Sequence, residues 1–303
     1  MKMKFLASGY LLTASAILLA AQAPAPTTPP ASAPPQGPLH RQYHEGEKLA
    51  YRMTGVNEDW HYTIEATGQV KRDSSGAFFE EYQWSDLKSA GQPTPLSPQT
   101  ADFRQRLTLD PNQNPSMPDL SKVDPKIIGP ITDFMTFYAD LWIAIKTGQL
   151  KGPGDHFYMP YGVPSSWADG TYVRLGQSSI DFDMTWKSTD STGHTAELEI
   201  RHVPPTKSMV TLPAAWMQAP VGDKPNNWVS VQKGQDGKLQ ASVGEETFDV
   251  HLTVSLADGK ILAGSMDNIV KTIQRTCDDD ALTHCTDAAP HQIHRKIGIA
   301  LEP

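Results

Sequence analysis

The chain has 303 residues, of which 39% are hydrophobic and 20% charged, and its formal net charge is −8. This length suits one large domain or two small ones, and the composition is that of an ordinary globular protein. A net acidic chain without a basic cluster argues against nucleic-acid binding, since phosphate recognition depends on clustered Lys and Arg.

The first 23 residues have the pattern of a secretory signal peptide. Lys2 and Lys4 precede an uncharged, apolar or small stretch over 5–21, and residues 21–23 have the small-x-small form that a signal peptidase accepts. We therefore expect export to the periplasm or envelope of a bacterium. An uncleaved membrane anchor is the alternative.

Residues 24–38 are rich in Pro, Ala, Thr and Ser. Such a segment has too few large apolar side chains to bury a core, so we expect a disordered linker. The remainder, 39–303, is predicted to be a single β-rich domain.

Alternation of apolar and polar residues predicts strands over most of this domain, because successive side chains of a strand point to opposite faces. Residues 112–130 are proline-rich and are predicted to form an irregular loop. The predicted strands before the C-terminal region are 48–53, 60–71, 76–84, 103–109, 156–161, 171–175, 179–187, 195–202, 228–232 and 238–243.

The C-terminal region carries the clearest strand pattern. Residues 247–256 alternate strictly and precede Asp258-Gly259, which predicts a two-residue hairpin turn. The return strand over 260–276 is long, and Gly264 is expected to mark a bulge in it. A third strand is predicted over 291–301.

One segment has helical rather than strand periodicity. Its apolar and aromatic residues recur at helical spacing, Thr132 or Asp133 can cap its start, and Gly148 can end it. The residues of this face are Phe134, Phe137, Tyr138, Leu141, Trp142 and Ile145. The predicted fold is α+β and mostly β: a large curved, half-barrel-like antiparallel sheet with this one long helix on its concave face.

The only two cysteines are Cys277 and Cys285, which flank a short acidic loop. We interpret them as a disulfide that closes the end of a hairpin, worth roughly 2–3 kcal/mol in the chain-entropy model. Two free or metal-binding cysteines are the alternative, and the export signal favours the bridge.

Two short segments carry a resemblance to known proteins. Residues 45–51 read Glu-Gly-Glu-Lys-Leu-Ala-Tyr and residues 256–260 read Leu-Ala-Asp-Gly-Lys, as in some uncharacterised bacterial envelope proteins. Those proteins resemble the lipoprotein-carrier superfamily of the LolA/LolB type, whose open half-barrel is closed by helices. The resemblance implies an exported protein that binds an apolar ligand, such as a lipid or a lipoprotein acyl chain.

Common catalytic signatures are absent from the sequence. It contains no G-x-S-x-G, H-E-x-x-H, P-loop or dinucleotide-binding glycine motif, and we predict no catalytic residue, metal or cofactor. A motif-poor hydrolase is the alternative, in which His202 or His251 would meet a carboxylate and a serine or a metal. Three further sets are interpreted as solvated surface: Glu197 with Glu199, Asp181 with Asp183, and His284, His291 and His294 near Asp278, Asp279 and Asp280.

The leading functional hypothesis is a non-enzymatic exported protein that holds an apolar ligand or acyl chain against the concave face of the sheet. The predicted ligand-binding residues are Phe134, Phe137, Tyr138, Trp142 and Trp167, with Trp167 as a lip or lid. A structural or interaction module with an envelope protein partner is the alternative.

Overall fold

The computed structural model describes residues 37–303, apart from 117, 121–122, 163, 169–171 and 235. The predicted signal and almost all of the predicted linker lie outside the described residues. Within them, the chain forms one fourteen-stranded antiparallel sheet and one long helix, α2 (Pro125–Thr147), together with the short helices α1 (Pro98–Ala101) and η1 (Ala215–Met217). The strands are β1 (Lys48–Asn57), β2 (Trp60–Arg72), β3 (Phe78–Ser89), β4 (Gln92–Pro93), β5 (Gln105–Leu107), β6 (His156–Met159), β7 (Ser165–Ser166), β8 (Val173–Ser178), β9 (Asp181–Thr189), β10 (Thr195–Val203), β11 (Trp228–Lys233), β12 (Leu239–Ser255), β13 (Ile261–Cys277) and β14 (Ala289–Leu301).

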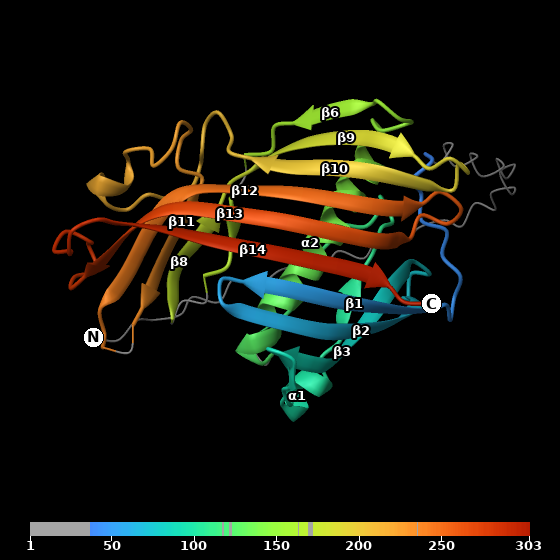
Figure 1. Cartoon of the computed structure of the whole chain (residues 1–303), viewed down its shortest axis with the longest axis horizontal. Helices are drawn as coiled ribbons and strands as arrows, with labels where there is room; N and C mark the ends of the chain where they lie inside the picture. The colour runs from blue at the N-terminus through green and yellow to red at the C-terminus, as the bar shows by residue number, and fades with distance from the viewer. Residues whose placement is uncertain (1–36, 117, 121–122, 163, 169–171, 235) are drawn as a thin grey trace, which may run out of the picture. The chain divides into compact units, whose positions relative to one another are not determined.

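The main path of the sheet runs in the order β4-β3-β2-β1-β14-β13-β12-β10-β9-β6. The two ends of the domain meet in its middle, because β1 pairs with β14 (Figure 1). β11 pairs with both β12 and β8, so a smaller set of strands leaves the main path there. The predicted fold class, mostly β with a large antiparallel sheet and few helices, is confirmed.

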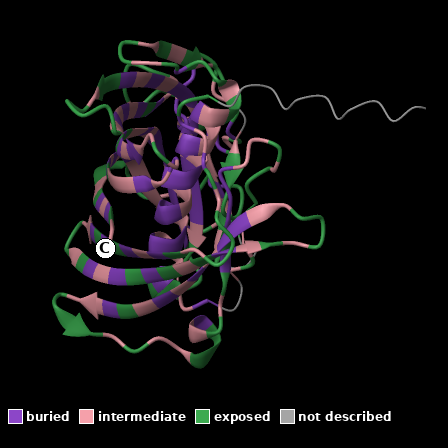
Figure 2. Ribbon diagram, turned by 90° about the vertical axis from the view of Figure 1, so that its right-hand side faces the viewer, coloured by how far each residue is buried: buried purple, intermediate pink, exposed green. Residues whose placement is uncertain are grey.

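The sheet has an inner face, which packs against α2, and an outer face on the opposite side. Along β12, Val250, Leu252 and Val254 are buried on the inner face, whereas Asp249 and His251 are exposed on the outer face. Figure 2 shows this alternation as stripes of buried and non-buried residues along the strands around the buried helix. A period of two therefore separates a core side from a polar side across the sheet.

Aromatic rings join α2 to the first strands. The Phe134 ring centroid lies 5.2 Å from that of Tyr51, 5.0 Å from that of Tyr82 and 5.5 Å from that of Trp84. All four side chains are almost completely buried. Edge-to-face packing of this kind adds to the large apolar area that each ring removes from water.

Gly264 has a different role from the one predicted. The irregularity in β13 lies between Ala263 and Ile261, which pair with consecutive residues of β12, so the bulge precedes Gly264. A Cβ atom at Gly264 would lie 3.1 Å from the Phe137 ring and 3.0 Å from Leu252, so the missing side chain lets the helix approach the sheet.

The predicted two-residue turn at Asp258-Gly259 is wrong, since the five residues 256–260 connect β12 to β13.

β12 is one strand where the sequence predicts two. The Gly-Glu-Glu segment at 244–246 has the composition of a break, yet pairing with β13 continues through it. Glu246 is buried there, its backbone N–H donates to Asn227 Oδ1 at 2.7 Å, and Asn268 Nδ2 donates to its carboxylate at 3.3 Å. The two halves of β12 pair with different neighbours, β11 over 239–244 and β10 over 248–255, and a small second core lies under the β11 half.

The helix starts earlier than predicted. Asp124 is its N-cap, and its side chain accepts a hydrogen bond from the backbone N–H of Lys126, so the predicted loop over 112–130 is wrong from Pro125 onward. Pro125 occupies the first helical position, where its missing N–H costs nothing. Gly148 ends the helix in a left-handed conformation, as predicted. No helix in the described part of the chain is both long and apolar enough to cross a membrane.

The predicted disulfide is confirmed. Cys277 and Cys285 are bonded, and Cys277 is completely buried in the second core. A disulfide is consistent with an exported protein, because cytosolic thiols are kept reduced.

Candidate functional site

The outer face of the sheet carries a groove of about 680 Å³. Small-molecule sites enclose roughly 300–1,000 Å³, so this groove has the volume of a binding site. Five strands contribute to it: β1, β2, β12, β13 and β14. Its outward-facing residues include Thr54, His61, Thr63, Asp249, His251, Ser265, Asp267, Lys296 and Gly298.

The floor of the groove follows from the register of the strands. Ser265 pairs with Gly298, Gly298 pairs with Thr54, and Thr54 pairs with Thr63 on the next strand. One row of small side chains therefore crosses four neighbouring strands. Longer polar side chains of the adjoining rows, such as Lys296 and His61, stand beside it.

Two aspartates face each other on this surface. Asp249 on β12 pairs directly with Asp267 on β13. Asp267 accepts a hydrogen bond from His294 Nε2 at 2.7 Å and lies 3.8 Å from Lys296 Nζ, whereas the ion-pair neighbour of Asp249 is His251, at 3.4 Å. Like charges directly opposite each other on neighbouring strands destabilise a sheet.

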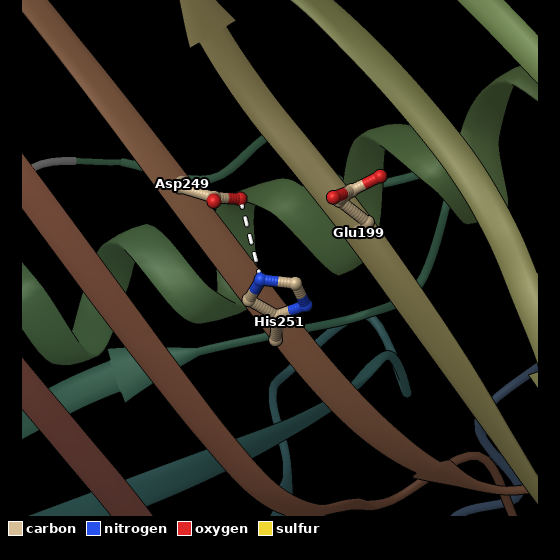
Figure 3. Close-up of side chains that lie close together, drawn as sticks. All are labelled: Glu199, Asp249 and His251. Carbon is tan, nitrogen blue, oxygen red and sulfur yellow. Dashed lines mark ion pairs between the residues drawn. The ribbon is translucent and has the colours of Figure 1, made fainter.

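At the β12 side of the groove, three potential metal ligands converge. Glu199 on β10 pairs directly with His251, and Asp249 lies two residues before His251 on the same face of β12. One ligand atom from each residue lies within 4.8 Å of the others. Figure 3 shows the three side chains close together, with α2 behind the sheet. Among the described residues, this is the one group of three or more His, Cys, Asp or Glu side chains with such spacing.

No family model matches this chain, and no curated protein matches it.

The aromatic residues predicted to bind a ligand belong mostly to the core. Phe134 and Phe137 are 0% exposed, and Tyr138 donates a hydrogen bond to Glu80 at 2.6 Å. Trp142 is half-buried, and its indole N–H donates to the backbone oxygens of Asp110 and Gln113. Their role in ligand binding stays a prediction, and their visible role is to hold the helix in place.

Trp167 lies away from the helix. It is 39% exposed, and its ring centroid lies 6.0 Å from that of Trp228. The ring lies over Gly176, where a Cβ atom would come within 2.3 Å of the indole nitrogen. Trp167 therefore forms a small aromatic surface with Trp228 over β8 and β11, and it is not part of the apolar face of α2.

A second, smaller cavity adjoins α2. It has about 250 Å³ and is lined by Met135, Tyr138 and Ala139 of the helix and by residues of the segments 106–108 and 113–116. This volume falls below the range typical of small-molecule sites. One of the predicted ligand-binding residues, Tyr138, borders this cavity.

His202, a residue of the hydrolase alternative, does meet a carboxylate. Its Nε2 lies 2.8 Å from Asp140 Oδ1, in the core between the rings of Phe182 and Phe248. Burial raises the pKa of Asp140, and the charge and hydrogen bond of His202 offset part of that rise. His202 Nδ1 has no hydrogen-bond partner, so no serine hydroxyl completes a triad there.

The histidines near the C-terminus do not form one site. His284 lies near Asp279, His291 near Glu58 and His294 near Asp267. Each histidine has its own carboxylate neighbour, and the interpretation of this region as solvated surface stays a prediction.

Sequence reasoning missed the Glu199, Asp249 and His251 group. The strict alternation of β12 does place Asp249 and His251 on one face, and Glu199 is outward-facing on its own strand. No sequence pattern predicts that β10 pairs with β12, and this pairing brings residues about fifty positions apart into one row.

Proposed function

We propose that this protein is an exported, non-enzymatic binding protein whose ligand occupies the groove on the outer face of the sheet. The observation that carries this proposal is the position of the groove. The groove of about 680 Å³ lies outside the sheet, while the inner face is covered by α2. A polar floor with His, Asp and Lys beside it suits a small polar molecule that both donates and accepts hydrogen bonds.

The proposed location is the bacterial periplasm or envelope. The signal-like N-terminus and the proline-rich segment after it support export, and the Cys277–Cys285 disulfide agrees with an oxidising compartment. The resemblance to envelope proteins supports the same location.

Native mass spectrometry of the protein isolated from its own cells tests the groove. The Ser265→Trp variant fills the floor from an exposed position, so the core is not disturbed. Ala300→Trp is the matched control, because Ala300 is exposed on the same face two residues beyond Gly298 and outside the groove. Both variants should unfold at the wild-type temperature.

We expect a discrete small-molecule adduct on the wild type and on Ala300→Trp, and its loss from Ser265→Trp. A wild-type protein without any adduct contradicts the proposal and favours an interaction module. An adduct that persists in Ser265→Trp places the ligand outside the groove.

Binding of an apolar ligand or acyl chain on the helix side is the second candidate function. The cavity beside Met135, Tyr138 and Ala139 favours it, as does the resemblance to lipoprotein carriers. This candidate predicts an adduct that organic solvent extracts and that Ser265→Trp retains.

A further inference from the structure

We propose that Glu199, Asp249 and His251 bind a divalent transition-metal ion such as zinc at the β12 side of the outer-face groove. The site joins two strands. Glu199 comes from β10, and the other two ligands come from alternate positions of β12.

The donor set selects the class of metal. One imidazole nitrogen and two carboxylate oxygens suit zinc and its first-row neighbours, because imidazole is a good ligand for these ions. Calcium and magnesium prefer sites made of oxygen ligands alone. We therefore expect zinc to bind in preference to calcium.

The spacing is close to that of a bound ion. Metal bonds of about 2.0–2.2 Å at tetrahedral angles put neighbouring ligand atoms roughly 3.4 Å apart. His251 Nε2 and Asp249 Oδ1 already lie 3.4 Å apart. The three ligand atoms lie within 4.8 Å of one another, so metal binding would bring the Glu199 carboxylate closer to the other two and away from Lys187 Nζ, which now lies 3.1 Å from it.

The charges around Asp249 are mixed. Asp267 faces it across the β12–β13 pair, Arg201 faces it across the β10–β12 pair, and Lys296 Nζ lies 3.8 Å from Asp267. A divalent ion bound to Asp249 would add positive charge beside the two aspartates.

The metal site deepens the proposed function and rests on the same groove. Asp249 and His251 line the groove, and three protein ligands leave at least one coordination position for water or for an anionic group of the ligand. A carboxylate or phosphate group on the groove ligand fits that position.

Calorimetric titration of the whole, metal-stripped chain with zinc tests the site. We expect one zinc ion per chain and a loss of affinity of about tenfold or more in His251→Asn and in Glu199→Gln. Glu197→Gln is the matched control, because it removes the same charge two residues away on the same face of β10. Its affinity should stay within about twofold of the wild type.

Three results overturn the proposal: no zinc binding by the wild type, zinc binding that His251→Asn and Glu199→Gln leave intact, or zinc binding that His156→Asn abolishes instead. The third result would move the site to His156 and Asp183 on the same face. Zinc binding without a groove adduct would support the metal site and refute the proposed function. An adduct without zinc binding would support the proposed function and refute the metal site.

Discussion

Asp249 and Asp267 stand directly opposite each other on β12 and β13, with both carboxylates on the outer face of the sheet. Their pairing predicts that Asp249→Asn stabilises the metal-free protein, by up to about 1 kcal/mol, because it removes a like-charge contact. The gain should shrink in high salt, since exposed charges are screened. Urea unfolding at low and high salt measures it.

With zinc present, the wild type should be more stable than Asp249→Asn, because the ion binds the folded wild type and thereby favours the folded state. Asp267→Asn is the control, since Asp267 is not one of the three ligands. An Asp249→Asn protein that is less stable than the wild type without metal would contradict this account of the pair.

Arg41 ties the N-terminal segment to the sheet through a buried ion pair. Its Nε lies 2.9 Å from Glu80 Oε1, and both side chains are 1% exposed. Arg41→Ala leaves a buried carboxylate without its cation, so we expect a loss of about 3–5 kcal/mol in the free energy of unfolding. Arg72→Ala, which breaks an exposed pair with Glu45, should cost a small fraction of that. Equal losses in the two variants would show that burial does not set the cost.

Acid should weaken the same region through Glu47. Burial alone would raise its pKa, but hydrogen bonds from Lys260 and Arg41 outweigh burial and hold the pKa below its usual value of 4.5. A carboxyl group whose folded-state pKa is depressed contributes stability that is complete above its unfolded pKa and is lost as pH falls through the folded value.

We therefore expect Glu47→Gln to lower the unfolding temperature near neutral pH and to match the wild type more closely below about pH 4. Thermal unfolding across this range measures the difference between the two proteins. A difference that stays constant, or grows, as the pH falls would refute the assignment to Glu47.

Gly264 makes the close contact between α2 and the sheet possible. A valine there would drive its side chain into Phe137 and Leu252, so Gly264→Val should cost about 1–3 kcal/mol by overpacking. In a Phe137→Leu background the same substitution should cost less, since the two residues share one space. Strictly additive losses in urea unfolding would show that the helix does not press on this position.

Local patterns were sufficient to predict much of the fold. Alternation in β12 and helical spacing around Phe134 depend on residues close in sequence, and both predictions hold. The start of α2 at Asp124 was missed because Pro125 and Pro130 look like loop residues, although proline is well accommodated at the first helical position. The continuity of β12 was missed because Glu246 reads as exposed, and only its tertiary partners Asn227 and Asn268 explain its burial.

The candidate site was harder to predict than the fold. From the sequence, aromatic residues such as Phe137 are predicted to bind a ligand, yet in the structure their surfaces are covered by the sheet. The Glu199–His251 row depends on the pairing of β10 with β12, which no short sequence pattern specifies. Strand register decides which polar residues meet, and it is a property of the whole sheet.

The most direct test of the central claim is the position of a bound molecule. A crystal structure of the protein, isolated with whatever adduct it carries from its own cells, would locate that molecule. Our account predicts density on the outer face, between His251 and Lys296 over the Ser265–Gly298 floor. Density beside Met135 and Tyr138 on the helix side, with an unoccupied outer groove, would contradict it.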